Sequence, residues 1–174
     1  MRILVAHASR MGSTAEIAQR VADQLSEAGN DVDVSPCADA ADAGGYAAVI
    51  VGSALYLGRW EKSALSYLKV HAAQLRERPT WLFQSGPCGA GSDVRTTGTP
   101  RAVTRLTKLI GVAPPVTFGG RLERSRARTR VSRWMASGTY AGDFRDWEQV
   151  GAWTAEILAR LEAARPAVPT DRQP

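Results

Sequence analysis

The sequence is poor in the residues that mark specialised protein classes. Its 174 residues include two cysteines, Cys37 and Cys88, whose spacing fits neither a disulfide scaffold nor a metal motif. No apolar run approaches the roughly 18 residues that a membrane span needs. The apolar start at Arg2–Ala6 is not followed by a signal-peptide cleavage site. We therefore expect one globular domain in the cytoplasm.

Positive charge is concentrated in one segment. The net charge is +5, from 22 basic and 17 acidic residues, and Arg121–Arg133 holds six arginines and one glutamate. This segment therefore accounts for the whole surplus. It suits a docking surface for an anionic substrate or for lipid headgroups, although charge runs are usually solvated loops. Nucleic acid is a weaker alternative, because no stacking platform or recognition helix accompanies the arginines.

Short apolar runs alternate with amphipathic stretches along the chain. Five strands are predicted, at residues 2–6, 31–35, 47–51, 80–84 and 115–118. Helices are predicted from about Ala15 to Gly29, over Ala64–Leu75, from Thr99-Pro100, and from Asp146. This order predicts an α/β fold in three layers, a doubly wound five-stranded parallel sheet of order 2-1-3-4-5.

The predicted domain covers residues 1–164. A basic insert at 120–145 lies between the fifth strand and the last helix. Residues 165–174 are polar and rich in proline, so we expect a disordered tail there.

The loop after the first strand is a candidate phosphate site. In such a sheet the ligand lies beyond the carboxyl ends of the strands, near the first and third. Residues 9–14 offer three hydroxyls, one glycine and the free amides of a helix N-terminus, which suit a phosphate. The alternative is plain helix capping by Ser13 or Thr14.

Two further loops should converge on the same crevice. Residues 52–60 contain Tyr56 and Trp60, which can stack on a flat ligand, unless Trp60 only anchors the following helix. Residues 85–93 contain three glycines, which let the backbone approach a ligand or simply make a flexible loop. We expect Cys88 in this loop to be a bystander, because no basic residue near it in sequence would lower its pKa.

These loops resemble those of the flavodoxin family, and the resemblance covers the chain from Met1 to about Leu161. It implies FMN as the cofactor, with the phosphate on the first loop and the isoalloxazine ring between the other two. The cofactor-binding residues that the resemblance implies are Ser9, Arg10, Met11, Gly12, Ser13, Thr14, Ala54, Leu55, Tyr56, Leu57, Gly58, Trp60, Ser85, Gly86, Pro87, Gly89 and Gly91.

Within the family the chain looks most similar to flavoproteins of the menaquinone-dependent protoporphyrinogen oxidase type. The similarity is carried by Tyr56, Gly58 and Trp60, by the basic insertion, and by the run DWEQV at 146–150. The segment between Leu122 and Asp146 departs from that group, because it is shorter and lacks a tyrosine-rich, apolar composition.

The resemblance implies an FMN-dependent oxidoreductase that passes electrons between an organic substrate and a quinone, with protoporphyrinogen IX as the candidate substrate. No side-chain acid or base is then required, and we expect His7 and His71 to be structural. The alternative is a flavodoxin-type electron carrier that docks to redox protein partners. Peripheral contact with the inner membrane face through Arg121–Arg133 is a further expectation, and the oligomeric state stays open.

Overall fold

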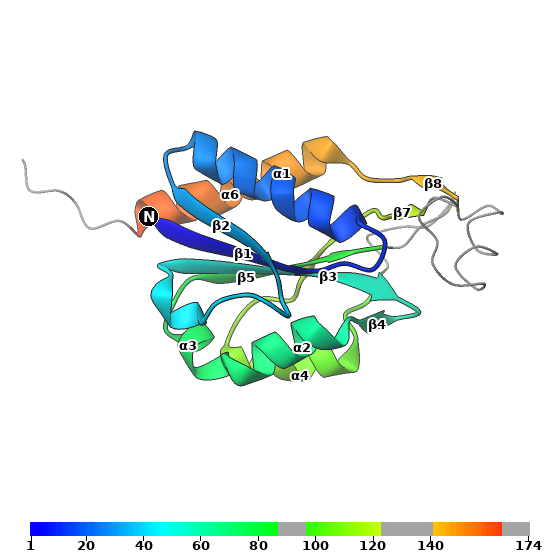
Figure 1. Ribbon diagram of the computed structural model, residues 1–174, viewed down its shortest axis with the longest axis horizontal. Coiled ribbons are helices and arrows are strands. Elements are labelled where there is room, and N and C mark those ends of the chain that lie inside the picture. The colour runs from blue at the N-terminus through cyan, green and yellow to red at the C-terminus, as the bar shows by residue number, and fades with distance from the viewer. Residues whose placement is uncertain (87–96, 123–140, 165–174) are drawn as a thin grey trace, which may run out of the picture.

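One parallel sheet lies between two layers of helices (Figure 1). The computed structural model describes residues 1–86, 97–122 and 141–164. Its strands are β1 (Arg2–Ala8), β2 (Asp31–Pro36), β3 (Ala48–Tyr56), β4 (Arg59–Trp60), β5 (Thr80–Ser85), β6 (Val116–Phe118), β7 (Arg121–Leu122) and β8 (Gly142–Asp143). Its helices are α1 (Ser13–Glu27), the 3-10 turn η1 (Ala43–Gly45), α2 (Lys62–Val70), α3 (Ala72–Arg76), α4 (Arg101–Ile110) and α6 (Trp147–Ala163).

The strand order is β2-β1-β3-β5-β6, with every neighbouring pair parallel. This confirms the predicted doubly wound sheet, because the predicted fourth and fifth strands are β5 and β6. The sequence pattern missed β4, which pairs antiparallel with β3, and the two-stranded ribbon of β7 and β8. Strands of two residues are too short to show a period of two.

The helices cover both faces of the sheet. Helices α1 and α6 lie on one face, and α2, α3 and α4 lie on the other (Figure 1). Alternate residues of β1 therefore serve two cores: Leu4 and Ala6 face the second layer, while Ile3 and Val5 face the first. Burial on both faces explains why these strands read as continuous apolar runs.

Helix boundaries differ from the predicted ones in three places. Helix α1 begins at Ser13 with Gly12 as its N-cap, two residues before the predicted start. The predicted second helix is divided at His71 into α2 and α3. Pro100 is the N-cap of α4 rather than its first residue. By contrast, α6 starts within one residue of the predicted position, and Asp146 is its N-cap, accepting a hydrogen bond from the Gln149 N–H at 3.0 Å.

The boundaries of the predicted domain are only partly within the described residues. Helix α6 ends at Ala163. Of the basic insert, the structure describes residues 120–122 and 141–145. Residues 123–140 and the predicted tail at 165–174 lie outside the described residues, so the predictions for them remain predictions.

A glycine in β3 makes room for an aromatic cluster beneath α6. Gly52 pairs with Phe83 of β5, and a Cβ on Gly52 would lie 2.0 Å from the Phe83 ring. That ring packs against Phe118 and Trp153, with centroids 5.9 Å away in both cases. The side chain of Phe83 thus fills the space that a residue at position 52 would otherwise take.

We predict that Gly52→Ala destabilises the fold. The added methyl group must displace the fully buried Phe83 ring, and overpacking of this kind costs about 1–3 kcal/mol of the free energy of unfolding. Urea denaturation measures the change. Gly45→Ala is the control, because a Cβ there meets nothing within 4 Å; equal stability of the two variants would contradict the prediction.

Candidate functional site

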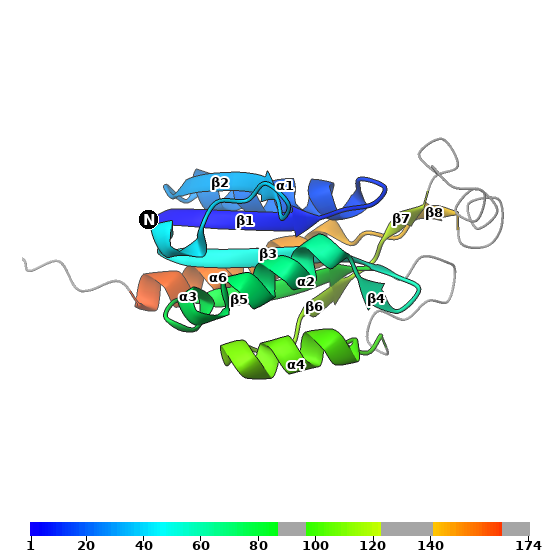
Figure 2. The same cartoon turned by 60° about the horizontal axis from the view of Figure 1, so that its bottom comes forward.

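The loops after β1, β3 and β5 start level with one another. In the parallel register Ala8 of β1 pairs with Ser53 of β3, and Ala54 of β3 pairs with Ser85 of β5. The predicted residues therefore converge at the carboxyl end of the sheet. In both views the β3–β4 hairpin and the β7–β8 ribbon extend from this same end (Figure 1, Figure 2).

The start of α1 is an open helix N-terminus. Gly12 has the left-handed φ of 93°, and no side chain caps the helix. The first helical hydrogen bond runs from the Glu16 N–H to the Gly12 carbonyl at 3.0 Å. The amides of Ser13, Thr14 and Ala15 precede it, so they have no partner within the helix. They form the positive end of a helix dipole, which favours an anion.

The hydroxyl groups of this loop hold it in place through hydrogen bonds. Ser9 Oγ accepts a hydrogen bond from the Gly12 N–H at 3.0 Å. Ser13 Oγ accepts from the Arg121 N–H at 3.1 Å, and Thr14 Oγ1 lies 2.7 Å from Ser85 Oγ. The capping alternative for Ser13 and Thr14 is therefore wrong, because both lie inside the helix. An accepting hydroxyl keeps its own hydrogen, so Ser9 and Ser13 can still donate to a ligand.

The β3–β4 hairpin has a two-residue turn. Leu57 and Gly58 both have left-handed φ angles, 49° and 71°, which match a type I′ turn. Leu55 pairs with Trp60, and Tyr56 pairs with Arg59. Since successive residues of a strand point to opposite sides, these two pairs lie on opposite faces of the hairpin. Leu57 stands at the tip with 71% of its surface exposed.

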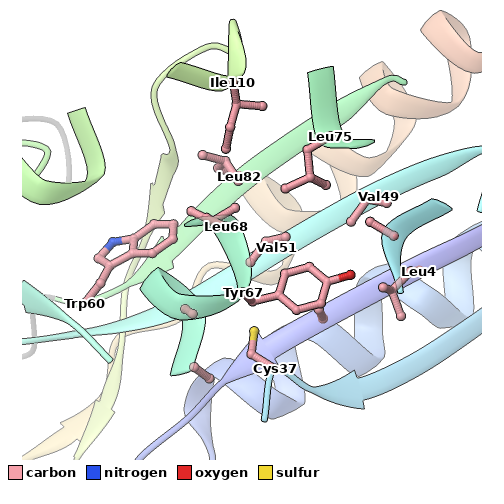
Figure 3. Close-up of a cluster of buried hydrophobic side chains, with 14 of the residues drawn as sticks. Leu4, Cys37, Val49, Val51, Trp60, Tyr67, Leu68, Leu75, Leu82 and Ile110 are labelled. Atoms are coloured by element: carbon pink, nitrogen blue, oxygen red, sulfur yellow. The ribbon is translucent and has the colours of Figure 1, made fainter. Parts of the chain in front are cut away.

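The inner face of the hairpin is fixed to β5. The Trp60 indole lies among buried side chains of the core (Figure 3), and its Nε1–H donates to Gln84 Oε1 at 2.9 Å. Gln84 Nε2 in turn donates to Thr117 Oγ1 at 3.0 Å. A Cβ on Gly86, whose φ is 127°, would lie 3.0 Å from the Leu55 carbonyl oxygen. Trp60 thus ties the hairpin to β5, a role different from the helix anchor that the sequence offered as the alternative to stacking.

The outer face of the hairpin borders a cavity of about 780 Å³. Arg10 reaches it from the first loop, with its guanidinium 4.4 Å from the centre of the Tyr56 ring and its Nε 3.1 Å from Glu61 Oε1. Arg59 and Lys62 also line the cavity. Arg10 therefore links the first two loops.

The remaining predicted residues divide between described and undescribed parts. Ala54 lies in β3, Ser85 ends β5, and Met11 is half-buried beside Gly12. Pro87, Gly89 and Gly91, together with Cys88, lie outside the described residues.

Ion pairs that the sequence did not predict join α1 to the roots of the basic insert. Glu16 accepts from Arg121 Nη2 through Oε1 and from Arg145 Nη1 through Oε2, both at 2.5 Å. Arg145 also donates to both carboxylate oxygens of Asp143, which raises the pKa of Arg145 and lowers that of Asp143. The Arg145 and Arg121 side chains are only 4% and 12% exposed.

This network corrects one expectation about the cationic segment. The Arg121 side chain is mostly buried and paired with Glu16, so it adds no charge to a docking surface. The network also explains part of the DWEQV run, because the Arg145 guanidinium stacks on the Trp147 ring at 4.5 Å. Positions 16, 121 and 145 are far apart in sequence, and no periodic pattern connects them.

Three further titratable side chains, those of His7, Cys37 and His71, are partly or fully buried, or bound to a neighbouring side chain. Burial lowers the pKa of His7 and raises the pKa of the Cys37 thiol to about 12. His71 Nδ1 is bound to Gln74 Oε1 at 2.9 Å. No cluster of metal-ligating side chains occurs among the described residues. Within the same residues, no helix is both long and apolar enough to cross a membrane.

Comparison with known proteins agrees with this geometry. A family model described as a flavodoxin domain matches residues 4–129. The chain belongs to the flavodoxin family. FMN is the cofactor of that family, which confirms the predicted cofactor. No curated protein matches the sequence.

Solved structures of flavodoxins share the fold at low sequence identity. A flavodoxin from the domain Archaea is 14% identical with a TM-score of 0.64, over 93% of this chain and 99% of that one. Flavodoxin 1 from Bacillus cereus is 15% identical with a TM-score of 0.59, over 91% and 98%. Rubredoxin oxygen:oxidoreductase from Desulfovibrio gigas is 16% identical with a TM-score of 0.60, over 93% of this chain and 36% of that one.

The residues present fit the flavodoxin cofactor. An uncapped helix with a left-handed glycine at its N-cap leaves amides for the phosphate without requiring a cationic side chain. The Gly86 backbone lies close to Leu55, because a Cβ there would be 3.0 Å from the Leu55 carbonyl oxygen, so the second and third loops start as neighbours.

We predict that Glu16→Gln destabilises the protein by about 2 kcal/mol. It leaves two partly buried arginines without their shared carboxylate, although Arg145 keeps Asp143, and breaking a fully buried pair costs roughly 3–5 kcal/mol. The loss is smaller here because the Glu16 side chain is 37% exposed. Denaturation measures it, with Glu156→Gln on the exposed face of α6 as the control, expected within about 0.5 kcal/mol of wild type. A Glu16→Gln protein as stable as this control would show that the network is not stabilising.

Proposed function

We propose that this flavodoxin-family protein is an FMN-dependent oxidoreductase that passes electrons between an organic substrate and a quinone. When bound, FMN supplies the hydride and electron chemistry, and the protein supplies position and electrostatics. Protoporphyrinogen IX is the first substrate to test, because the DWEQV run and the Tyr56–Trp60 element resemble those of protoporphyrinogen oxidase-type flavoproteins.

In this proposal the phosphate of FMN binds at the start of α1. The amides of Ser13, Thr14 and Ala15 and the hydroxyls of Ser9 and Ser13 would be its donors. Their position at the end of β1 supports this assignment. Arg10 stays in the proposal as a residue of the same loop, with its Nε paired to Glu61 and its guanidinium over the Tyr56 ring.

The ring would lie between the hairpin and the loop that follows β5. Leu55, Leu57 and Gly58 would line one side, and Ser85 and Gly86 would begin the other. Trp60 then acts as a positioning residue, because its hydrogen bond to Gln84 ties the hairpin to β5. Pro87, Gly89 and Gly91 stay in the proposal as residues of the same loop.

The observation that carries an enzymatic role is the cavity on the outer face of the hairpin. Its volume of about 780 Å³ is in the range of small-molecule sites. It is lined by Arg10, Arg59 and Lys62, against one carboxylate, that of Glu61. A carrier needs only an exposed flavin edge, whereas a substrate needs space beside the flavin loops.

The second candidate is a flavodoxin-type electron carrier with redox protein partners. It is favoured by the matches to single-domain flavodoxins along 98% and 99% of their length. The cations beside the hairpin would then select acidic partners.

We predict that Gly12→Ala weakens FMN binding about tenfold. A Cβ is disfavoured at a φ of 93° by roughly 1–2 kcal/mol, so the loop would shift and misplace its amides. Quenching of FMN fluorescence on titration measures the dissociation constant. Gly111→Ala is the control, because Gly111 has a similar φ of 80° at the far end of α4. Equal FMN affinity in the two variants would contradict the proposal that the FMN phosphate binds at this loop.

We predict that protoporphyrinogen IX reduces the bound flavin under anaerobic conditions and that a menaquinone analogue reoxidises it. Flavin absorbance follows both steps, with free FMN as the control for direct chemical transfer. Reduction by a redox protein but not by the porphyrinogen would favour the carrier. Failure of the protein to bind FMN at all would overturn both candidates.

A further inference from the structure

The cavity beside the hairpin lies on the side that faces away from β5. Tyr56 and Arg59 are cross-strand partners on this outer face, while Leu55 and Trp60 face Gly86 and Gln84. Trp60 also contributes to the lining of the cavity, as does Leu57 at the tip. The cavity therefore adjoins the hairpin that borders the proposed flavin slot.

Two cations at the cavity have no ion-pair partner among residues 1–86, 97–122 and 141–164. These are Arg59, next to the tip, and Lys62, the first residue of α2, both exposed. Arg10 differs from them, because Glu61 already balances its charge at 3.1 Å. The lining thus has a surplus of two positive charges, which an anionic ligand would neutralise.

Besides Glu61 and Ser63, the rest of the lining is apolar or aromatic: Tyr56, Leu57 and Trp60. Tyr56 presents a ring whose one face is covered by Arg10, and Leu57 contributes an exposed side chain at the tip. A free inorganic anion would make no use of these surfaces. An organic molecule that joins a flat apolar body to carboxylate groups would use both.

We propose that this cavity anchors the carboxylates of the substrate, with Arg59 and Lys62 as the anchoring cations. The substrate is then an organic dicarboxylate with an apolar body that extends past Leu57 towards the flavin. This inference rests on the proposed oxidoreductase function and names the substrate class for it. Arg59 and Lys62 set specificity and take no part in holding FMN.

The test is a binding measurement on the FMN-loaded protein with naphthalene-2,3-dicarboxylate, which carries both carboxylates on one edge, as the probe. Isothermal titration calorimetry compares wild type with the double variant Arg59→Gln/Lys62→Gln. We expect the dissociation constant to rise about tenfold in the variant, because two charge-assisted contacts are lost. The dimethyl ester of the probe should bind wild type at least tenfold more weakly than the dicarboxylate.

The matched control is Arg105→Gln/Lys108→Gln on α4, which removes one arginine and one lysine from an exposed surface elsewhere. Its affinity for the probe should stay within twofold of wild type, as should the FMN affinity of both double variants. Equal probe binding by the two double variants, or equal binding of ester and dicarboxylate, would overturn the proposal. Inorganic phosphate that competes as well as the dicarboxylate would also overturn it.

Steady-state kinetics with protoporphyrinogen IX distinguishes a failure of this inference from a failure of the proposed function. If protoporphyrinogen IX is oxidised, Arg59→Gln/Lys62→Gln should raise its KM about tenfold with little change in kcat, and an unchanged KM overturns the anchor while the function stands. If the porphyrinogen is not oxidised but the probe depends on Arg59 and Lys62, the anchor stands and another dicarboxylate is the substrate.

Discussion

The parallel pairing of β3 with β1 on one side and β5 on the other is the constraint on which the site depends. It sets Ala8 beside Ser53 and Ala54 beside Ser85, so three chain segments leave the sheet at one level. The open helix N-terminus, the hairpin and the Gly86 loop are neighbours only because of this register. Gly52 takes part as well, since it lets the Phe83 ring cross beneath β3 and keeps the strands at their normal spacing.

The sequence predicted the sheet and the loops because both leave local signals. Runs such as 47–51 are apolar throughout, and a strand buried on both faces requires this. The hairpin left no such signal: its turn is Leu57-Gly58 rather than Asn-Gly, and β4 has only two residues. The direction of Trp60 follows from the register of that short strand, so stacking and anchoring could not be separated from sequence.

Ion pairs between residues far apart in the chain also could not be predicted from the sequence. Glu16 meets Arg121 and Arg145 across more than 100 positions, and a charge count treats all three as surface residues. The same count drew attention to the segment from Arg121 to Arg133, although its first arginine is buried. The cations that line the cavity, Arg59 and Lys62, belong to the part of the chain whose charges balance. The net charge thus pointed to the arginine-rich segment. Only the fold could show which charged side chains lack an ion-pair partner among the described residues.

In the proposed arrangement the hairpin forms a wall of both the flavin slot and the cavity, and this has a thermodynamic consequence. Its inner face is tied to β5 through Trp60 and Gln84, and its outer face bears Tyr56 and Arg59. A molecule that shifts or stiffens this wall from one side changes the free energy of binding on the other. Such coupling is reciprocal: whatever factor an occupant of the cavity applies to flavin affinity, the flavin applies to the affinity of that occupant.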